Sequence, residues 1–329
     1  MSMRKINYRS AIRIALSEEL SRDDRVFLLG EDIGEAGGVF KVTEGLIREF
    51  GSKRVIDTPI SETAIIGAAL GASLGGLIPI AELMFSDFAC VAMDQIVNQI
   101  AKKAYLSAGQ EKIGLVIRLV TGGGVSFGPQ HSQSLEAWFG HVPGLYTVLA
   151  SNPRNARGLL KSSIRSGKPV LFFEHKALYP YEGDVPYSED LIPIGKCQVM
   201  REGDDLTIIG GGATVRVAEE CASKLETQGI SAEVIDIQTL SPLDTTTIFR
   251  SVEKTGRVMI VEDDVLFLGW GAEIAAEIAE NVLYSLKSPI RRIGAPYSPV
   301  PFSPLLEKVY LPNTDLAFRT AIKLVKEET

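Results

Sequence analysis

The sequence predicts an α/β protein with two domains, each built on a mainly parallel β-sheet. Its 329 residues are more than one hydrophobic core usually serves. The strand candidates are apolar throughout, and helical patterns separate them. Strands without a polar face, joined by helices, indicate parallel sheets covered on both sides.

Short apolar runs predict the strands of the first sheet at residues 26–29, 54–57, 77–83, 115–119, 146–149 and 170–174. Helical patterns lie at residues 44–50, 62–74, 87–107, 134–139 and 153–166. Residues 1–20 lack the apolar stretch of a signal peptide, and their pattern predicts an amphipathic helix.

Residues 178–193 interrupt this pattern with a stretch rich in Pro, Gly, Asp and Tyr, which is typical of a connection between domains. We therefore expect a first domain over residues 1–185, a linker over 186–198 and a second domain over 199–329. Further βα units follow the linker. Their strands are expected at 205–209, 231–236, 257–262 and 290–293, and their helices at 215–228, 243–255, 271–286 and 315–326.

Composition excludes several classes of protein. The formal net charge is −7 and no run of Lys or Arg occurs, so neither nucleic acid nor an anionic membrane is the expected partner. The three cysteines form no CxxC pair, which excludes a disulfide framework and the usual zinc sites and suits the reducing cytoplasm. The apolar run 63–80 is shorter than the roughly 20 residues of a membrane span, so we expect a buried helix.

Two glycine-rich segments follow predicted strands. Residues 208–215 lack the third glycine of a dinucleotide-binding turn, because Val215 occupies that position, and an ordinary βα turn is favoured. Residues 121–134 contain no GK[ST] and are therefore not a P-loop, but they place flexible backbone at the sheet edge where such folds bind ligands. For His131 in this segment, catalysis and a structural hydrogen bond both stay open. His141 and His175 are expected to be structural.

Glu62 follows the segment IDTPIS, in which Ser61 is the expected N-cap of a helix. A carboxylate in the first turn stabilises a helix, so a purely structural role is possible. The residues that follow Glu62 are nearly all apolar, which predicts dry surroundings. A carboxylate in dry surroundings is costly without a dedicated partner, and this favours a functional role.

Six segments, taken together and in order along the chain, resemble the beta chains of thiamin-diphosphate-dependent 2-oxo acid dehydrogenases. These segments are VFLLGEDIGEAGGVFKVTEGL, RVIDTPISE, AELMFSDFACVAMDQI, QHSQSLEAWFGHVPGL, IRSGKPVLFFEHKALY and IPIGK. That family includes the pyruvate, branched-chain 2-oxo acid and acetoin enzymes. The resemblance implies a transketolase-like pyrimidine-binding domain followed by a transketolase C-terminal-like assembly domain. It also implies an oxidoreductase that decarboxylates a 2-oxo acid and acylates the lipoyl group of an acyltransferase core.

The same resemblance implies roles for individual residues. Glu62 would hydrogen-bond the pyrimidine N1′ of thiamin diphosphate, and His131 would face the substrate or the lipoyl group. The cofactor ring would be lined by Ile60, Met84 and Phe88, with Phe85 nearby. Members of the family often hold a monovalent cation such as K⁺ through backbone carbonyls, and the matching positions are Leu115, Ser163, Ile164 and Ser166.

The chain contains no GDG motif, which in this family binds the diphosphate and Mg²⁺ on the alpha chain. The resemblance also implies a heterotetramer of two alpha and two beta chains. The small-molecule substrate stays open between pyruvate, a branched-chain 2-oxo acid and acetoin. A single-chain thiamin enzyme such as transketolase would need a diphosphate domain for which 329 residues leave no room. A flavoprotein-like electron carrier would need the complete glycine fingerprint and would have no use for Glu62.

Assembly also needs a contact surface, and the second domain shows no acid/base cluster after Pro193. Phe267 and Trp270, which precede the predicted helix 271–286, are candidate interface residues. Ordinary core packing is the alternative for both, because aromatic side chains are common in cores and in interfaces.

Overall fold

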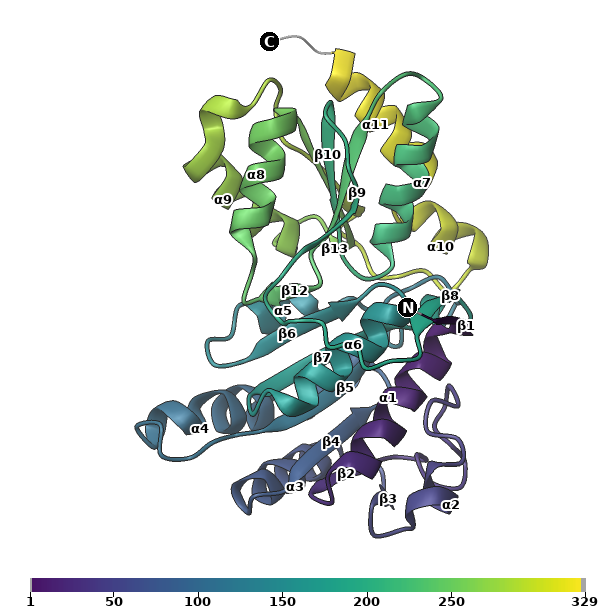
Figure 1. Ribbon diagram of the computed structural model, residues 1–329, viewed down its shortest axis with the longest axis vertical. Coiled ribbons are helices and arrows are strands. Elements are labelled where there is room, and N and C mark those ends of the chain that lie inside the picture. Colours follow the sequence, from purple (N-terminus) through teal and green to yellow (C-terminus); the bar gives the residue numbers. More distant parts are fainter. Residues whose placement is uncertain (1, 327–329) are drawn as a thin grey trace. The chain divides into compact units, whose positions relative to one another are not determined.

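The computed structural model describes residues 2–326, which divide into two units (Figure 1). The first unit comprises residues 2–121 and 138–194, and the second comprises residues 122–137 and 195–326. The chain passes from one unit to the other after Ile194, and the glycine-rich segment 122–137 folds with the second unit. The domain limits expected from the sequence stay predictions.

The first unit is built on a parallel sheet with the strand order β6-β7-β5-β4-β2-β3. Its strands are β2 (Val26–Gly30), β3 (Val55–Asp57), β4 (Ile78–Leu83), β5 (Leu115–Thr121), β6 (Tyr146–Ala150) and β7 (Pro169–His175). Gly30 pairs with both Asp57 and Glu82, so the carboxyl ends of β2, β3 and β4 lie at one edge. The predicted strands and their parallel arrangement are confirmed.

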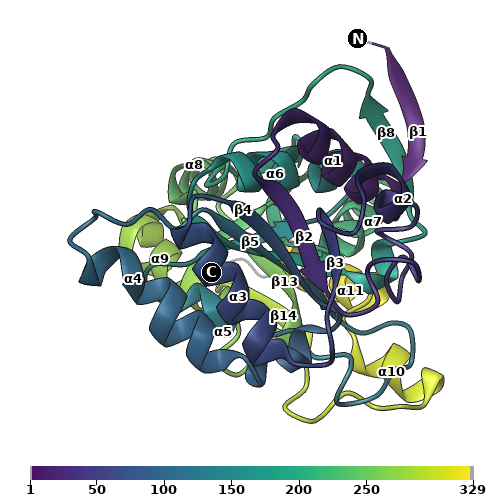
Figure 2. The same cartoon turned by 90° about the horizontal axis from the view of Figure 1, so that it is seen from below.

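Helices cover both faces of this sheet (Figure 2). One face carries α1 (Tyr8–Arg22) and α6 (Pro153–Arg165), and the other carries α3 (Glu62–Leu74), the π-helix η2 (Gln95–Ile100) and α4 (Ala101–Leu106). The side chains of Asn7 and Asn152 accept the N–H groups of Ser10 and Asn155, which fixes the starts of α1 and α6. The remaining short helices are α2 (Leu46–Phe50), η1 (Ser86–Cys90), α5 (Glu136–Gly140) and η3 (Lys176–Leu178).

Three parts of the sequence-based picture of the first unit are wrong. The segment predicted as one helix over 87–107 is divided into η1, η2 and α4. Residues 3–7, expected to be helical, form strand β1 (Met3–Asn7), which pairs antiparallel with β8 (Glu182–Pro186). Strand β8 lies within the stretch expected to be a plain connection. Both strands are short and mostly polar, and each satisfies its backbone groups through the other.

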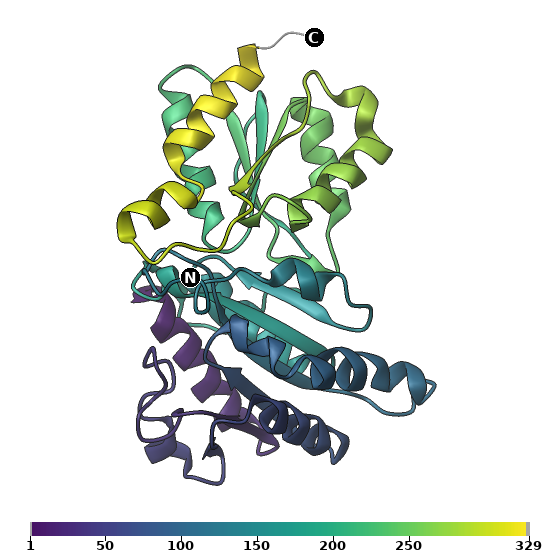
Figure 3. The ribbon, with the colours of Figure 1, turned by 180° about the vertical axis from the view of Figure 1, so that it is seen from behind.

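The second unit contains a five-stranded sheet with the order β14-β13-β10-β11-β9, in which only β9 runs antiparallel. Its strands are β9 (Gln198–Arg201), β10 (Leu206–Gly210), β11 (Ala232–Asp236), β13 (Val258–Val265) and β14 (Arg291–Ala295); β12 (Thr239–Ser241) is separate from this sheet. Helices α7 (Thr214–Glu226) and α11 (Thr314–Lys326) cover one face, and α8 (Thr245–Thr255) and α9 (Trp270–Val282) cover the other (Figure 3). Two short helices, η4 (Leu283–Ser285) and α10 (Pro304–Tyr310), complete the unit.

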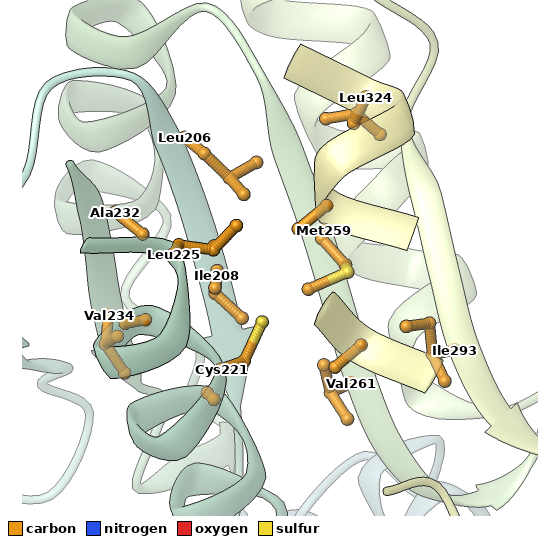
Figure 4. Packing of buried hydrophobic residues seen from close by; sticks show 14 residues of the cluster. Leu206, Ile208, Cys221, Leu225, Ala232, Val234, Met259, Val261, Ile293 and Leu324 are labelled. Atoms are coloured by element: carbon orange, nitrogen blue, oxygen red, sulfur yellow. The ribbon is translucent and has the colours of Figure 1, made fainter. Parts of the chain in front are cut away.

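The core between α7, α11 and the sheet of the second unit is apolar (Figure 4). Ile208, Val234 and Met259 project from three strands, and they pack against Leu225 of α7 and Leu324 of α11. Cys221 lies in this cluster as a small hydrophobic residue. No helix in residues 2–326 is both long enough and apolar enough to cross a bilayer.

A buried ionic network lies at the centre of the first sheet. Arg118 on β5 is 1% exposed, and it forms a two-pronged pair with Glu174 of β7 at 2.6 and 2.8 Å. Its remaining nitrogen donates to Glu82 of β4. Burial raises the pKa of Glu82, although Arg118 opposes this shift. The hydroxyl of Tyr179 donates to Glu174 at 2.9 Å. Arg118 and its partners therefore connect β4, β5 and β7 with the segment that follows β7.

Replacing Arg118 with Met should destabilise the chain strongly, because Glu82 and Glu174 would remain buried without their counter-charge. Removing one partner of a buried ion pair costs about 3–5 kcal/mol. Urea unfolding followed by circular dichroism measures the loss. Arg154→Met is the matched control, because the Arg154–Asp190 pair lies at the surface and surface pairs contribute less than about 1 kcal/mol. Equal losses in both variants would contradict a central role for Arg118.

Candidate active site

The candidate site lies where the carboxyl ends of β2, β3 and β4 meet. Glu31 follows β2 directly, Asp57 ends β3, and Met84 follows β4. Helix α3 begins at Glu62, a few residues after β3. Parallel sheets bind ligands at this edge, because the loops that leave the strands converge there.

Two carboxyl groups, those of Glu31 and Glu62, lie near each other at this edge. Glu31 is 8% exposed, and its Oε1 accepts the N–H of Ser61 at 3.3 Å. Burial raises the pKa of Glu31, and the negative charge of Glu62 raises it further. Glu31 was not identified from the sequence. The signal for it was an acidic residue directly after a buried strand, within LLGED.

Glu62 does not have the dry surroundings that its sequence neighbours predicted. It is half-buried, and Ala64 and Ala68 on the following turns of α3 are exposed. Ser61 occupies the N-cap position, but its hydroxyl donates to the carbonyl of Pro59 at 3.1 Å and does not cap the helix. The apolar character of α3 comes from small residues at an exposed surface as well as from its buried face. Glu31 is thus the buried carboxyl group of the pair.

The side chains expected to line a cofactor ring lie at the same edge. Met84 and Phe88 are half-buried, and Ile60 is 84% exposed. Phe85 is buried and contacts Phe88 edge to face, with ring centroids 5.7 Å apart. The first unit therefore carries a carboxyl pair with partly uncovered apolar side chains around it.

His131 lies in the segment 122–137, which belongs to the second unit, and it is half-buried. Its backbone N–H donates to the carbonyl of Gly128 at 3.4 Å. His141 is exposed. Nδ1 of His175 accepts the N–H of Ala177 and so caps η3, which is a structural contact.

The positions matched to a cation site lie at the start of one strand and at the end of one helix. Leu115 begins β5, and Ser163 and Ile164 lie in the last turn of α6, just before Ser166. The carbonyl of Ser163 accepts both the N–H and the hydroxyl of Ser166, at 3.2 and 2.7 Å. The described residues contain no cluster of three His, Cys, Asp or Glu side chains able to hold a metal ion. The end of α6 presents backbone carbonyls, and such a helix end favours positive charge.

The glycine-rich turn at residues 208–215, between β10 and α7, is closed by the side chain of Thr214. The hydroxyl of Thr214 accepts the N–H of Gly211 at 3.0 Å and contacts the carbonyl of Val261 at 2.7 Å. This hydroxyl ties the start of α7 to the neighbouring strand β13. The geometry is that of an ordinary βα turn.

Comparison with known proteins agrees with this architecture. Residues 4–182 match the pyrimidine binding domain of transketolase, and residues 195–316 match the transketolase C-terminal domain. The beta subunit of 2-oxoisovalerate dehydrogenase from Bacillus subtilis (strain 168) is 45% identical over 315 residues, which cover 95% of this chain and 96% of that protein. The chain belongs to the beta subunits of the thiamin-diphosphate-dependent 2-oxo acid dehydrogenases. It is accordingly a subunit of an oxidoreductase, and the beta designation implies an alpha partner.

Other members of the family are similar to the same degree. The beta subunit of the acetoin:2,6-dichlorophenolindophenol oxidoreductase of B. subtilis (strain 168) is 44% identical and covers 98% of both chains. The beta subunit of the Rickettsia felis pyruvate dehydrogenase E1 component is 43% identical, over 94% of this chain and 95% of that one. A split-gene transketolase, solved as an inactive beta4 tetramer, has a TM-score of 0.80 at 24% identity over 98% of this chain and 99% of that one. This likeness confirms the predicted fold class.

The raised pKa of Glu31 predicts how stability depends on pH. The folded chain holds a proton on Glu31 more tightly than the unfolded chain, so this group adds stability as the pH falls through its raised pKa. The gain is complete below the ordinary value of 4.5. Glu31→Gln keeps an oxygen for the Ser61 N–H and cannot titrate. The melting temperature of Glu31→Gln minus that of wild type should therefore be more positive at pH 8 than at pH 5.

The control for this measurement is Glu35→Gln, which removes an exposed carboxyl group from the same loop. We expect its melting temperature to follow that of wild type at both pH values. A difference between Glu31→Gln and wild type that does not change with pH would contradict the burial of a titrating Glu31.

Proposed function

We propose that this chain supplies the pyrimidine half of a thiamin diphosphate site and that Glu62 is its acid/base residue. The observation that carries the proposal is the position of the buried Glu31 beside the start of α3, where its Oε1 accepts the N–H of Ser61, the residue before Glu62. When bound, the cofactor supplies the carbanion chemistry of decarboxylation. The protein has to bind the ring, orient it and deliver a proton at one ring nitrogen.

The residues at this edge fit an aminopyrimidine ring. A flat heteroaromatic ring needs apolar surfaces on its faces and a hydrogen-bonding group at its edge. Ile60, Met84 and Phe88 offer the apolar surfaces, and each is at least partly exposed. Glu62, at the start of α3, offers the carboxyl group that would meet N1′.

Glu31 gives this arrangement a source of protons. Its burial and the nearby charge of Glu62 favour its protonated form. The negative charge of Glu62 makes ionisation of Glu31 less favourable, because like charges repel each other. We therefore propose that Glu62 acts at N1′ and that the neighbouring Glu31 favours a protonated carboxyl group at this edge.

The reaction needs groups that this chain does not carry. We propose that the alpha chain holds the diphosphate and Mg²⁺, since the sequence contains no GDG motif, and that two alpha and two beta chains form a heterotetramer. In this complex His131 would face the 2-oxo acid or the lipoyl group of the acyltransferase core. The carbonyls near Ser163 would hold K⁺. The three free cysteines support a location in the reducing cytoplasm.

Two exposed surfaces support partner binding. The outer side of α3 presents the small residues Ala64, Ala68 and Gly71, which allow another backbone to approach closely. In the second unit the rings of Phe267 and Tyr297, 62% and 79% exposed, contact each other at 5.3 Å. Trp270, expected as a second interface residue, is only 8% exposed and belongs mainly to the core, because it begins a helix that packs on the sheet.

The substrate is proposed to be a 2-oxo acid, pyruvate or its branched-chain analogue. Acetoin is the alternative, because an acetoin oxidoreductase subunit is 44% identical over 98% of both chains, close to the 45% of the 2-oxoisovalerate dehydrogenase subunit. The same carboxyl pair would serve all three substrates, because it acts on the cofactor ring. Turnover of the three compounds by the reconstituted complex, with 2,6-dichlorophenolindophenol as electron acceptor, would rank them.

Glu62→Gln should nearly abolish turnover while the complex still assembles, because an amide cannot supply a proton to N1′. The expected loss in kcat is on the order of 10² to 10⁴-fold, the usual contribution of a positioned acid/base group. Glu49→Gln is the matched control: Glu49 is likewise a carboxylate in the first turn of a helix, but it is exposed on α2. A Glu62→Gln complex with more than about half of the wild-type rate, far inside that range, would show that Glu62 is not the acid.

A further inference from the structure

The glycine-rich segment that precedes His131 has a demanding backbone. Gly122, Gly124, Ser126 and Gly128 all have positive φ angles, between 61° and 93°. Glycine adopts such angles freely, but Ser126 at φ 61° does so at a cost. A non-glycine residue keeps this conformation only where the surrounding structure fixes it.

The group that fixes it is the carboxylate of Glu307 on α10. Its Oε1 accepts the N–H of Gly124 at 2.8 Å, and its Oε2 accepts the N–H and the hydroxyl of Ser126 at 2.8 and 3.1 Å. Alternating backbone conformations of this kind point successive N–H groups at one place and form a binding site for an anion. Here the anion is a side chain of the same unit, from a residue 183 positions further along the chain.

Helix α10 is oriented to deliver this carboxylate. Glu307 is 3% exposed, whereas Leu305, Leu306 and Val309 on the same helix are 79%, 61% and 80% exposed. A helix that buries its acid and exposes its aliphatic residues reverses the usual pattern. The buried carboxylate of Glu307 is compensated because three donors of the loop hydrogen-bond to it. Hydrogen bonds to an ionised group are stronger than those between neutral groups.

The segment around α10 also contacts the loop sterically. A Cβ on Gly128 would come within 2.7 Å of the ring of Phe302, and one on Gly123 within 3.2 Å of Leu311. The loop therefore lies directly against residues 302–311. His131 is three residues beyond Gly128 and is joined to it by the turn hydrogen bond from its own N–H.

We propose that Glu307 is a positioning residue for His131: it holds the glycine-rich loop in the one conformation that places the histidine for catalysis. The inference rests on the proposed function, in which His131 faces the substrate or the lipoyl group. Glu307 itself touches neither. The second unit would then contribute to turnover as well as to assembly.

The test uses Glu307→Gln in the complex reconstituted with an alpha chain, with pyruvate, 2-oxoisovalerate and acetoin as substrates. An amide presents one oxygen and one NH₂ group, so one loop N–H would face a donor and the loop would shift. We expect kcat to fall on the order of 10-fold or more, because small misplacements of a catalytic group have effects of that size. Glu280→Gln, at an exposed carboxylate of α9, should keep the wild-type kcat.

A double-mutant cycle separates positioning from general structural damage. If Glu307 acts through His131, adding Glu307→Gln to His131→Asn should lower kcat by less than about twofold further. Losses that multiply in full would overturn the inference. Should Glu307→Gln fail to fold, Gly123→Ala tests the packing of the loop against α10 and Leu311, because its Cβ would lie 3.2 Å from Leu311 and 3.3 Å from the Glu307 carboxylate. An active Gly123→Ala complex with unchanged kcat would overturn the inference as well.

The outcomes also distinguish this inference from the function on which it rests. A wild-type complex inactive on all three substrates would overturn the proposed function and the role of Glu307 with it. An active wild-type complex with an equally active Glu307→Gln variant would overturn only the role of Glu307.

Discussion

The central strands of the first sheet are held together by the buried guanidinium of Arg118. Burial by itself would lower its pKa, but Glu174 and Glu82 outweigh that effect and the pKa is raised, so the charge persists. Through these two partners it joins β5 to its neighbours on both sides. The hydroxyl of Tyr179 binds Glu174, and its ring contacts Phe40, which contacts Phe85, which in turn contacts Phe88. A chain of specific contacts therefore runs from the centre of the sheet to the proposed ring pocket.

Two carboxyl groups of different exposure lie at the edge of that sheet. Glu31 is enclosed and its pKa is raised, whereas Glu62 is half-exposed at the start of a helix. One of them is suited to keep a proton and the other to meet a ligand from outside the chain. In the proposed function, the uncovered apolar side chains near Glu62, Ile60 above all, would belong to a site that the alpha chain completes.

Local sequence pattern predicted the elements that bury an apolar face, because periodicity follows directly from burial. The strand expected at 170–174 is β7 (Pro169–His175), and the helix expected at 62–74 is α3 (Glu62–Leu74). The pairing of β1 with β8 was missed, because both strands are short and polar and their partners are nearly 180 residues apart. The surroundings of Glu62 were wrongly predicted, because the composition of one helix does not show whether another element covers it. The contacts of Glu307 could not be predicted, since they depend on a loop conformation that only tertiary structure fixes.

Calorimetric titration with cofactor and Mg²⁺ would show whether this chain forms half of a thiamin diphosphate site, as we propose. The chain alone should bind the cofactor weakly or not at all, because the groups that hold the diphosphate are expected on the alpha chain. The alpha–beta complex should bind it stoichiometrically, and Glu62→Gln should weaken that binding, whereas the control Glu49→Gln should not. Tight, stoichiometric binding by the isolated chain would contradict the account, because the site would then be complete within one polypeptide.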